Sequence, residues 1–185
     1  MGESPGNPSL FTALGWVAQY HYDAVESLRR YFNPDSMGSP ARFDGSHAVR
    51  LDARPVDYFE ETGLRSSLAI LTWIEAVFQL DYQYRSRRNG PKDSLSKAFR
   101  AIRKSGKRIT RLDPELFDAW TKHTLGVNAL IGDLRNAFKY RNWLAHGRYW
   151  TPKLGRHYDF EYLYRLAETV YRNLPLCDLD EASGG

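Results

Sequence analysis

Residues 139–147 read Lys-Tyr-Arg-Asn-Trp-Leu-Ala-His-Gly and close an amphipathic helical pattern that begins near Val127. Stepped at about 100° per residue, five apolar positions of this pattern fall within roughly 60° of one another: Val127, Ile131, Leu134, Phe138 and Ala145. Arg141 lands near the middle of the same stripe, where a leucine would be expected. A guanidinium stays charged at ordinary pH, so its removal from water requires a partner or a polar cleft.

Two further polar residues gather near this arginine. Asn142 and His146 are four residues apart, so a helix places them on one flank. Gly147 is a helix-stop signal, which places His146 in the last turn or at the cap. The pattern therefore predicts a positive charge, an amide and a titratable imidazole at one helix terminus.

Three interpretations of this cluster follow from the residue types. In the first, Arg141 lies along the core and pairs with a carboxylate while His146 caps helix carbonyls, a structural role common for long cationic side chains. In the second, the cluster binds an anion such as phosphate without reacting. In the third, it is catalytic, because imidazole exchanges protons near neutral pH and a guanidinium stabilises phosphoryl charge.

The spacing Arg141-Asn142-x-x-x-His146 resembles the R-x(4–6)-H signature of the HEPN superfamily (higher eukaryotes and prokaryotes nucleotide-binding domain), including the polar residue that commonly follows the arginine. The motif also closes the penultimate expected helix of a small helical chain, as in HEPN topology. The resemblance implies a ribonuclease that forms a homodimer with a composite active site. It also implies a reaction without metal or cofactor, in which the RNA 2′-hydroxyl attacks the adjacent phosphate and leaves a 2′,3′-cyclic phosphate and a 5′-hydroxyl.

The resemblance assigns roles to the three motif residues. His146 is the general acid/base, Arg141 stabilises charge on the phosphoryl oxygens, and Asn142 orients the imidazole or holds a phosphate oxygen. HEPN members add an acidic residue from an earlier helix to position the arginine, and both Glu75 and Asp81 are candidates for it. The resemblance further implies the toxin of a toxin–antitoxin or phage-defence system, with an antitoxin protein as a partner.

The rest of the chain favours one helical domain. Its 185 residues are 42% hydrophobic, which suits one sizeable core better than two. We expect a flexible leader over 1–8, a single HEPN-like domain over 9–176 with a long loop over 33–54, and a flexible tail over 177–185. Apolar residues recur at helical spacing, so the predicted fold class is an all-α, up-and-down helical bundle. Helices are expected over 9–31, over 55–87 with a break near Gly63, over 94–105, in a short segment from 114, over 127–146 and over 160–174.

A basic segment lies in the middle of the chain. Between Arg85 and Arg111 there are eleven Lys or Arg residues and a single acid, Asp93. Four of these cations are candidate RNA-binding residues on the third expected helix, opposite an apolar face: Lys97, Arg100, Arg103 and Lys104. Such a stripe can neutralise several phosphates and release counterions. RNA is the favoured partner; a solvated helix face and an acidic partner protein are the alternatives.

The sequence also indicates a cellular compartment and lacks the patterns of two common kinds of site, a zinc-binding helix and a phosphate-binding glycine loop. The single cysteine allows no intramolecular disulfide, and neither a transmembrane run nor a secretion signal occurs, so a cytoplasmic protein without membrane association is expected. The five histidines show no pair at the spacing of a zinc-binding helix, and no phosphate-cradling glycine loop occurs. His21 lies on the apolar face of the first helix and is expected to be a hydrogen-bonded core residue. Two other functions stay open: a HEPN domain that binds RNA or a nucleotide without cutting, and a helical protein-interaction module.

Overall fold

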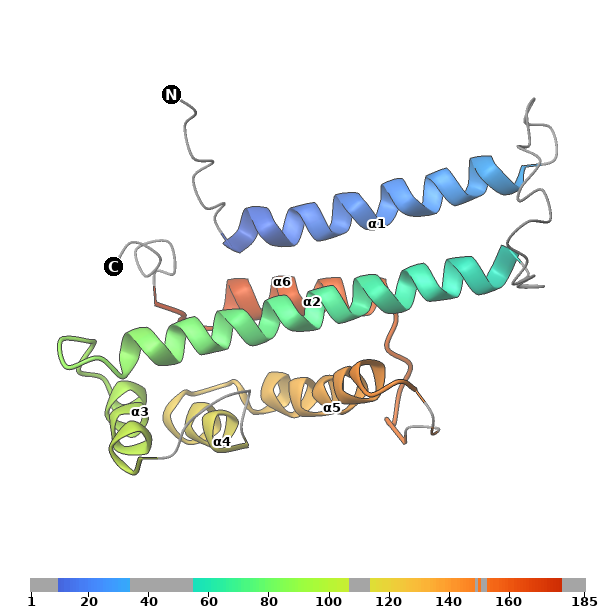
Figure 1. Cartoon of the computed structure of the whole chain (residues 1–185). Helices are drawn as coiled ribbons and strands as arrows, with labels where there is room; N and C mark the ends of the chain where they lie inside the picture. The colour runs from blue at the N-terminus through green and yellow to red at the C-terminus, as the bar shows by residue number, and fades with distance from the viewer. Residues whose placement is uncertain (1–9, 34–54, 107–113, 149, 151–152, 178–185) are drawn as a thin grey trace, which may run out of the picture.

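The computed structural model describes residues 10–33, 55–106, 114–148, 150 and 153–177. Within these residues every element of regular secondary structure is an α-helix, which confirms the expected all-α bundle (Figure 1). The six helices are α1 (Leu10–Phe32), α2 (Pro55–Arg85), α3 (Ser94–Lys104), α4 (Pro114–His123), α5 (Asn128–Ala145) and α6 (Phe160–Asn173). The expected leader, nearly all of the expected loop over 33–54, and the tail after residue 177 lie outside the described residues. No described helix is long and apolar enough to cross a membrane.

Helix α2 is the central element of the bundle. Its 31 residues extend about 46 Å at 1.5 Å per residue, and α1, α3, α5 and α6 all pack against it. Its inward side consists of fully buried apolar side chains: Ile70, Leu71, Ile74, Val77 and Phe78. Figure 1 shows α1 and α5 lying on different sides of this helix. Four of the five other described helices are therefore positioned by direct packing against α2, while α4 packs mainly against α3 and α5.

The expected break near Gly63 is wrong, because α2 continues through this residue. A glycine inside a helix costs only about 1 kcal/mol relative to alanine. Local bonds support the helix on either side, since Thr62 donates its hydroxyl to the Tyr58 carbonyl at 2.8 Å and Arg65 pairs with Glu61 at 2.9 Å. Packing of α1 along this part of α2 adds burial that outweighs the glycine cost.

Aromatic contacts join the smaller helices to α2. Phe78 of α2 meets Phe117 and Trp120 of α4 edge to face, with ring centroids 5.5 and 5.8 Å apart. Tyr82 makes the same kind of contact with Phe99 of α3 at 5.2 Å. These large buried rings bring α3 and α4 onto one end of α2.

His21 joins α1 to two other helices, as the expectation of a hydrogen-bonded core residue requires. The buried imidazole Nδ1 lies 3.0 Å from the Ser66 hydroxyl of α2. The ring stacks on Phe160 of α6 with centroids 3.6 Å apart. Burial lowers the pKa of His21, and Glu161 opposes this shift. The neutral ring therefore serves the packing of α1.

A buried ionic cluster fastens the end of α2 to the C-terminal segment. The Arg85 Nε donates to both carboxylate oxygens of Asp81, at 2.9 and 3.0 Å, and its Nη1 donates to Asp93 at 3.1 Å. Arg85 also donates to the Pro175 carbonyl, while the Cys177 backbone N–H donates to Asp81 at 2.9 Å. Burial, with Asp81 adding to it, raises the pKa of the Cys177 thiol to about 11. Asp81 therefore has a structural role at the end of α2.

Candidate active site

Helix α5 ends as the motif predicts. His146 is the C-cap residue, and its backbone N–H donates to the Asn142 carbonyl at 3.1 Å. Gly147 adopts a φ of +85°, and the next N–H, from Arg148, reaches back to the Trp143 carbonyl at 3.3 Å. This 6→1 bond is that of a Schellman motif. The glycine therefore turns the chain directly after His146 and leaves this side chain exposed at the helix end.

The site arginine is held by a carboxylate from α2. One Arg141 Nη lies 2.9 Å from a Glu75 oxygen, and the two side chains are 25% and 16% exposed. The Arg141 Nε is buried without a hydrogen-bond partner among the described residues. The guanidinium is thus oriented and keeps both unused donor capacity and access to solvent. Of the two acidic candidates, Glu75 makes this contact and Asp81 does not, because Asp81 is occupied by Arg85.

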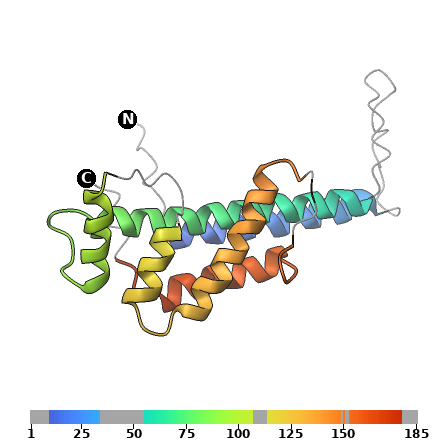
Figure 2. The ribbon, with the colours of Figure 1, turned by 90° about the horizontal axis from the view of Figure 1, so that it is seen from below.

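The expected apolar stripe of α5 is wrong at its last member, Ala145, whereas Arg141 keeps its predicted place on the inward side. The buried positions of α5 are Ile131, Leu134, Ala137 and Tyr140, whereas Ala145 is exposed. The helix crosses α2 obliquely (Figure 2), so its inward face rotates along its length and its last turn lies outside the core. Arg141 lies one turn before Ala145 on the inward side, where its Nε is buried and its side chain is partly exposed.

Asn142 and His146 share the exposed flank of the last turn. The bond described between them joins backbone atoms, and among the described residues no hydrogen bond joins the Asn142 amide to the imidazole. The structure therefore brings the three motif residues to one helix terminus, with the arginine oriented by Glu75 and the imidazole open to solvent. It does not show the ring held by Asn142.

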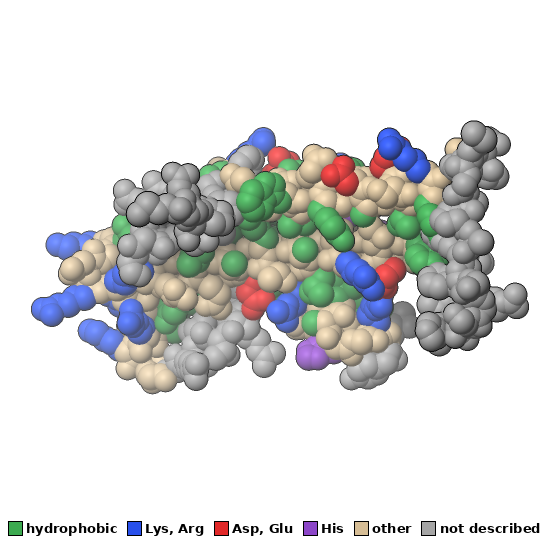
Figure 3. All heavy atoms as spheres, turned by 45° about the horizontal axis from the view of Figure 1, so that its top comes forward, with side chains coloured by type: hydrophobic (Ala, Val, Ile, Leu, Met, Phe, Trp, Pro, Cys, Tyr) green, Lys and Arg blue, Asp and Glu red, His purple; other side chains and the backbone are tan. Residues whose placement is uncertain are grey.

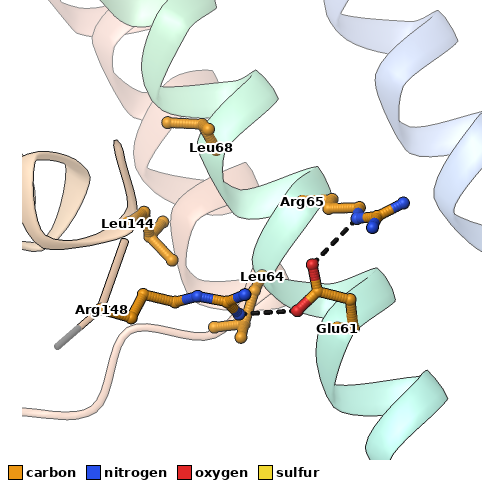
Figure 4. A pocket seen from close by; sticks show the side chains of 6 residues that line it. All are labelled: Glu61, Leu64, Arg65, Leu68, Leu144 and Arg148. Atoms are coloured by element: carbon orange, nitrogen blue, oxygen red, sulfur yellow. Dashed lines mark hydrogen bonds and ion pairs between the residues drawn. The ribbon is translucent and has the colours of Figure 1, made fainter. Parts of the chain in front are cut away.

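Arg148 and Glu61 form an ion pair beside the motif that the sequence did not predict. Arg148, at a φ of +59°, is in the left-handed region that non-glycine residues rarely occupy. Its guanidinium pairs with Glu61 of α2 at 2.6 Å, and Arg65 pairs with the same carboxylate (Figure 4). The hydrogen bond from Arg148 is the main cause that lowers the pKa of Glu61. No sequence signal links residues 87 positions apart, so this contact was not predictable.

These side chains enclose a small hollow next to the motif. Its volume is about 100 Å³, and it is lined by Glu61, Leu64, Arg65, Leu68, Leu144 and Arg148. Figure 4 shows Arg65 and Arg148 directed toward Glu61 from opposite sides. Leu144 and Arg148 stand on either side of His146 in the chain, so the hollow lies at the same end of α5, although His146 does not line it.

The four candidate RNA-binding residues lie apart from the motif, on α3. Lys97 and Lys104 are exposed. Arg100 donates to the carbonyls of Arg85 and Pro91 at 3.1 and 2.8 Å, and Arg103 donates to the Ser86 carbonyl at 3.4 Å. Two of the four therefore cap the end of α2, where cations also favour the helix dipole.

The arrangement suits charge stabilisation and proton transfer on an anionic ester. A half-buried cation attracts phosphate more strongly than a solvated one, and an exposed imidazole can exchange a proton with a bound substrate. One subunit offers one such imidazole at this helix end. No protein-family model, curated protein sequence or solved structure matches the chain.

Proposed function

We propose that this protein is a metal-independent endoribonuclease of the HEPN type. The observation that carries the proposal is the pairing of Arg141 with Glu75 at 2.9 Å, which orients a partly exposed guanidinium on the turn that ends in His146. A purely structural arginine needs neither solvent access nor a neighbouring exposed histidine. The sequence resemblance to HEPN ribonucleases supplies the reaction class.

In the proposed reaction, the 2′-hydroxyl of RNA attacks the adjacent phosphorus. A base takes the hydroxyl proton, the bond from phosphorus to the 5′-oxygen breaks, and an acid protonates this leaving oxygen. His146 serves as acid/base, Arg141 stabilises the phosphoryl oxygens, and Asn142 holds a phosphate oxygen or the ring. Since two proton transfers need two groups, a second subunit supplying its own His146 completes the site.

An exposed aromatic surface on α1 supports a homodimer. Trp16 and Tyr20 of α1 are 61% and 72% exposed, and both line a hollow of about 360 Å³ together with Arg65 and Ala69 of α2. Arg65 also lines the hollow formed with Leu144 and Arg148 at the end of α5. Exposed aromatic side chains of this size mark interaction surfaces. Figure 3 shows hydrophobic side chains at the surface over α1 and α2.

Replacing Trp16 with Glu is expected to weaken the dimer and cleavage together. A buried tryptophan at an interface is typically worth at least about 2 kcal/mol, which is about 30-fold in the dissociation constant. Sedimentation velocity over a concentration series measures this constant. Leu125→Glu is the matched control, because Leu125 is 99% exposed in the turn before α5. A wild-type protein that is monomeric at every concentration contradicts the composite site.

The nuclease itself is tested by incubating purified protein with mixed RNA in the presence of EDTA. Wild-type protein is expected to yield fragments with 2′,3′-cyclic phosphate and 5′-hydroxyl ends, whereas His146→Ala yields none above background. Growth arrest on expression, relieved by the same substitution, would agree with a toxin that acts on cytoplasmic RNA and is restrained by an antitoxin. RNA that binds but stays intact would favour the non-cleaving alternative. Indifference to RNA would favour the protein-interaction module.

A further inference from the structure

Two cationic features lie at different positions along α2. The motif end is the C-terminal end of α5 with the turn after it, residues 141–148. It contacts α2 through the ion pairs Arg141–Glu75 and Arg148–Glu61. The basic residues gather around its other end, after Arg85, where α3 begins (Figure 1). Arg85 lies 10 residues after Glu75, which holds Arg141, and 24 residues after Glu61, which holds Arg148. The two features are therefore separated by about 15 to 36 Å of helix.

The basic end consists of six exposed cations: Arg87, Arg88, Lys92, Lys97, Arg103 and Lys104. None of the six forms an ion pair with a carboxylate in the part of the chain that the structure describes. The one nearby acid, Asp93, is occupied by Arg85 and by the Ser96 backbone N–H. Figure 3 shows Lys and Arg side chains concentrated on this end of the molecule.

Helix capping accounts for only part of this charge. The carbonyls of Arg85, Ser86 and Pro91 are satisfied by Arg100 and Arg103. The other cations of the basic end are not needed for this purpose and repel one another. Several of them surround an open hollow of about 400 Å³ lined by Ser86, Arg88, Arg100, Arg103 and Lys104, which is wide enough to accept a phosphate.

We infer that the basic end is a second RNA-backbone site that binds the same RNA as the motif end. The substrate is then a folded RNA with a stem long enough to reach both ends, and not a nucleotide or a short oligomer. An A-form RNA duplex rises somewhat less per base pair than the about 3.4 Å of B-DNA, so separations of about 15 to 36 Å correspond to roughly five base pairs up to somewhat more than ten. The role of the motif end in this inference rests on the proposed function.

Two sites on one RNA make a specific prediction about length. Once the RNA reaches both, the second contact is intramolecular and the affinity rises steeply. An RNA that is too short to contact both the motif end and the basic end binds to only one of them at a time. The increase in affinity with stem length therefore measures whether one RNA contacts both sites. The affinity of a single hairpin does not.

The test is fluorescence anisotropy with labelled RNA hairpins of about 4 and about 16 base pairs, which lie below and above the estimated separations. All proteins carry His146→Ala, which keeps the RNA intact. We expect the longer hairpin to bind about tenfold more tightly than the shorter one. The double variant Lys97→Glu and Lys104→Glu is expected to reduce this gain to less than about twofold, and Arg141→Ala is expected to reduce it as well.

The control is Arg29→Glu with Arg165→Glu, which changes the charge equally on exposed cations of α1 and α6 and should leave the gain intact. A gain that survives in the Lys97 and Lys104 variant overturns the inference. So does failure to bind either hairpin, which would point to an acidic protein as the occupant of the basic end. Failure of wild-type protein to cut RNA that it binds in the expected manner rejects the nuclease and leaves the bridging supported.

Discussion

Arg141→Ala is expected to slow RNA cleavage by at least about 100-fold, the usual cost of removing one donor that stabilises transition-state charge. The fold should survive, because Arg141 borders the core and keeps solvent access. Single-turnover cleavage of a saturating RNA isolates this chemical step from binding. Thermal unfolding measured on the same samples reports whether the loss is structural.

Arg135 provides the matched control for this experiment. It lies on the same helix and pairs with Asp118 of α4 at 2.5 Å, with its side chain 35% exposed. If Arg141 only braces two helices, Arg135→Ala and Arg141→Ala should affect cleavage and stability alike. A similar small loss in both variants would therefore contradict a catalytic role for Arg141.

The Glu75 carboxylate, which stays charged when Arg141 is replaced, requires a separate control. Arg141→Ala leaves Glu75 without its cation at a mostly buried position, which could destabilise α2 for reasons unrelated to catalysis. Arg141→Ala combined with Glu75→Gln removes that charge. We expect the double variant to regain stability while staying inactive, and recovery of cleavage would count against the electrostatic role.

Local signals explain why the helix boundaries were predictable. Gly147 ends α5 through its positive φ, and Asp93 and Asp159 cap α3 and α6 by accepting backbone N–H groups three residues later. Each of these effects acts within one turn and involves residue types with known preferences. The spacing of Arg141, Asn142 and His146 likewise sufficed to place them on one helix end.

Contacts between distant residues were not predictable from the sequence. The choice of Glu75 over Asp81 depends on which turn of α2 faces α5, and helical spacing alone gives no such register. The exposure of Ala145 depends on the oblique crossing of two helices. The use of Arg100 as a cap arises because the end of α2 lies against α3.

Asp81→Ala is expected to have the largest effect on stability of any single change outside the apolar core, about 3 kcal/mol, because the buried Arg85 guanidinium then keeps only the partly exposed Asp93 as a counter-charge. Asp81 is fully buried and Arg85 nearly so, and the same carboxylate accepts the Cys177 backbone N–H. Urea unfolding followed by circular dichroism measures the loss.

Asp118→Ala is the matched control for Asp81→Ala, since it breaks an exposed aspartate–arginine pair worth about 0–1 kcal/mol. A loss for Asp81→Ala no greater than this would mean that water reaches Arg85 and that the end of α2 is not sealed. The double variant Asp81→Leu with Arg85→Met separates charge from packing. Apolar residues of similar volume often replace a buried ion pair without loss, so this variant should recover much of the stability if the uncompensated charge is the cause. If it stays as unstable as Asp81→Ala, the hydrogen bonds to Pro175 and Cys177 hold the C-terminal segment against α2, and the two charges contribute little beyond them.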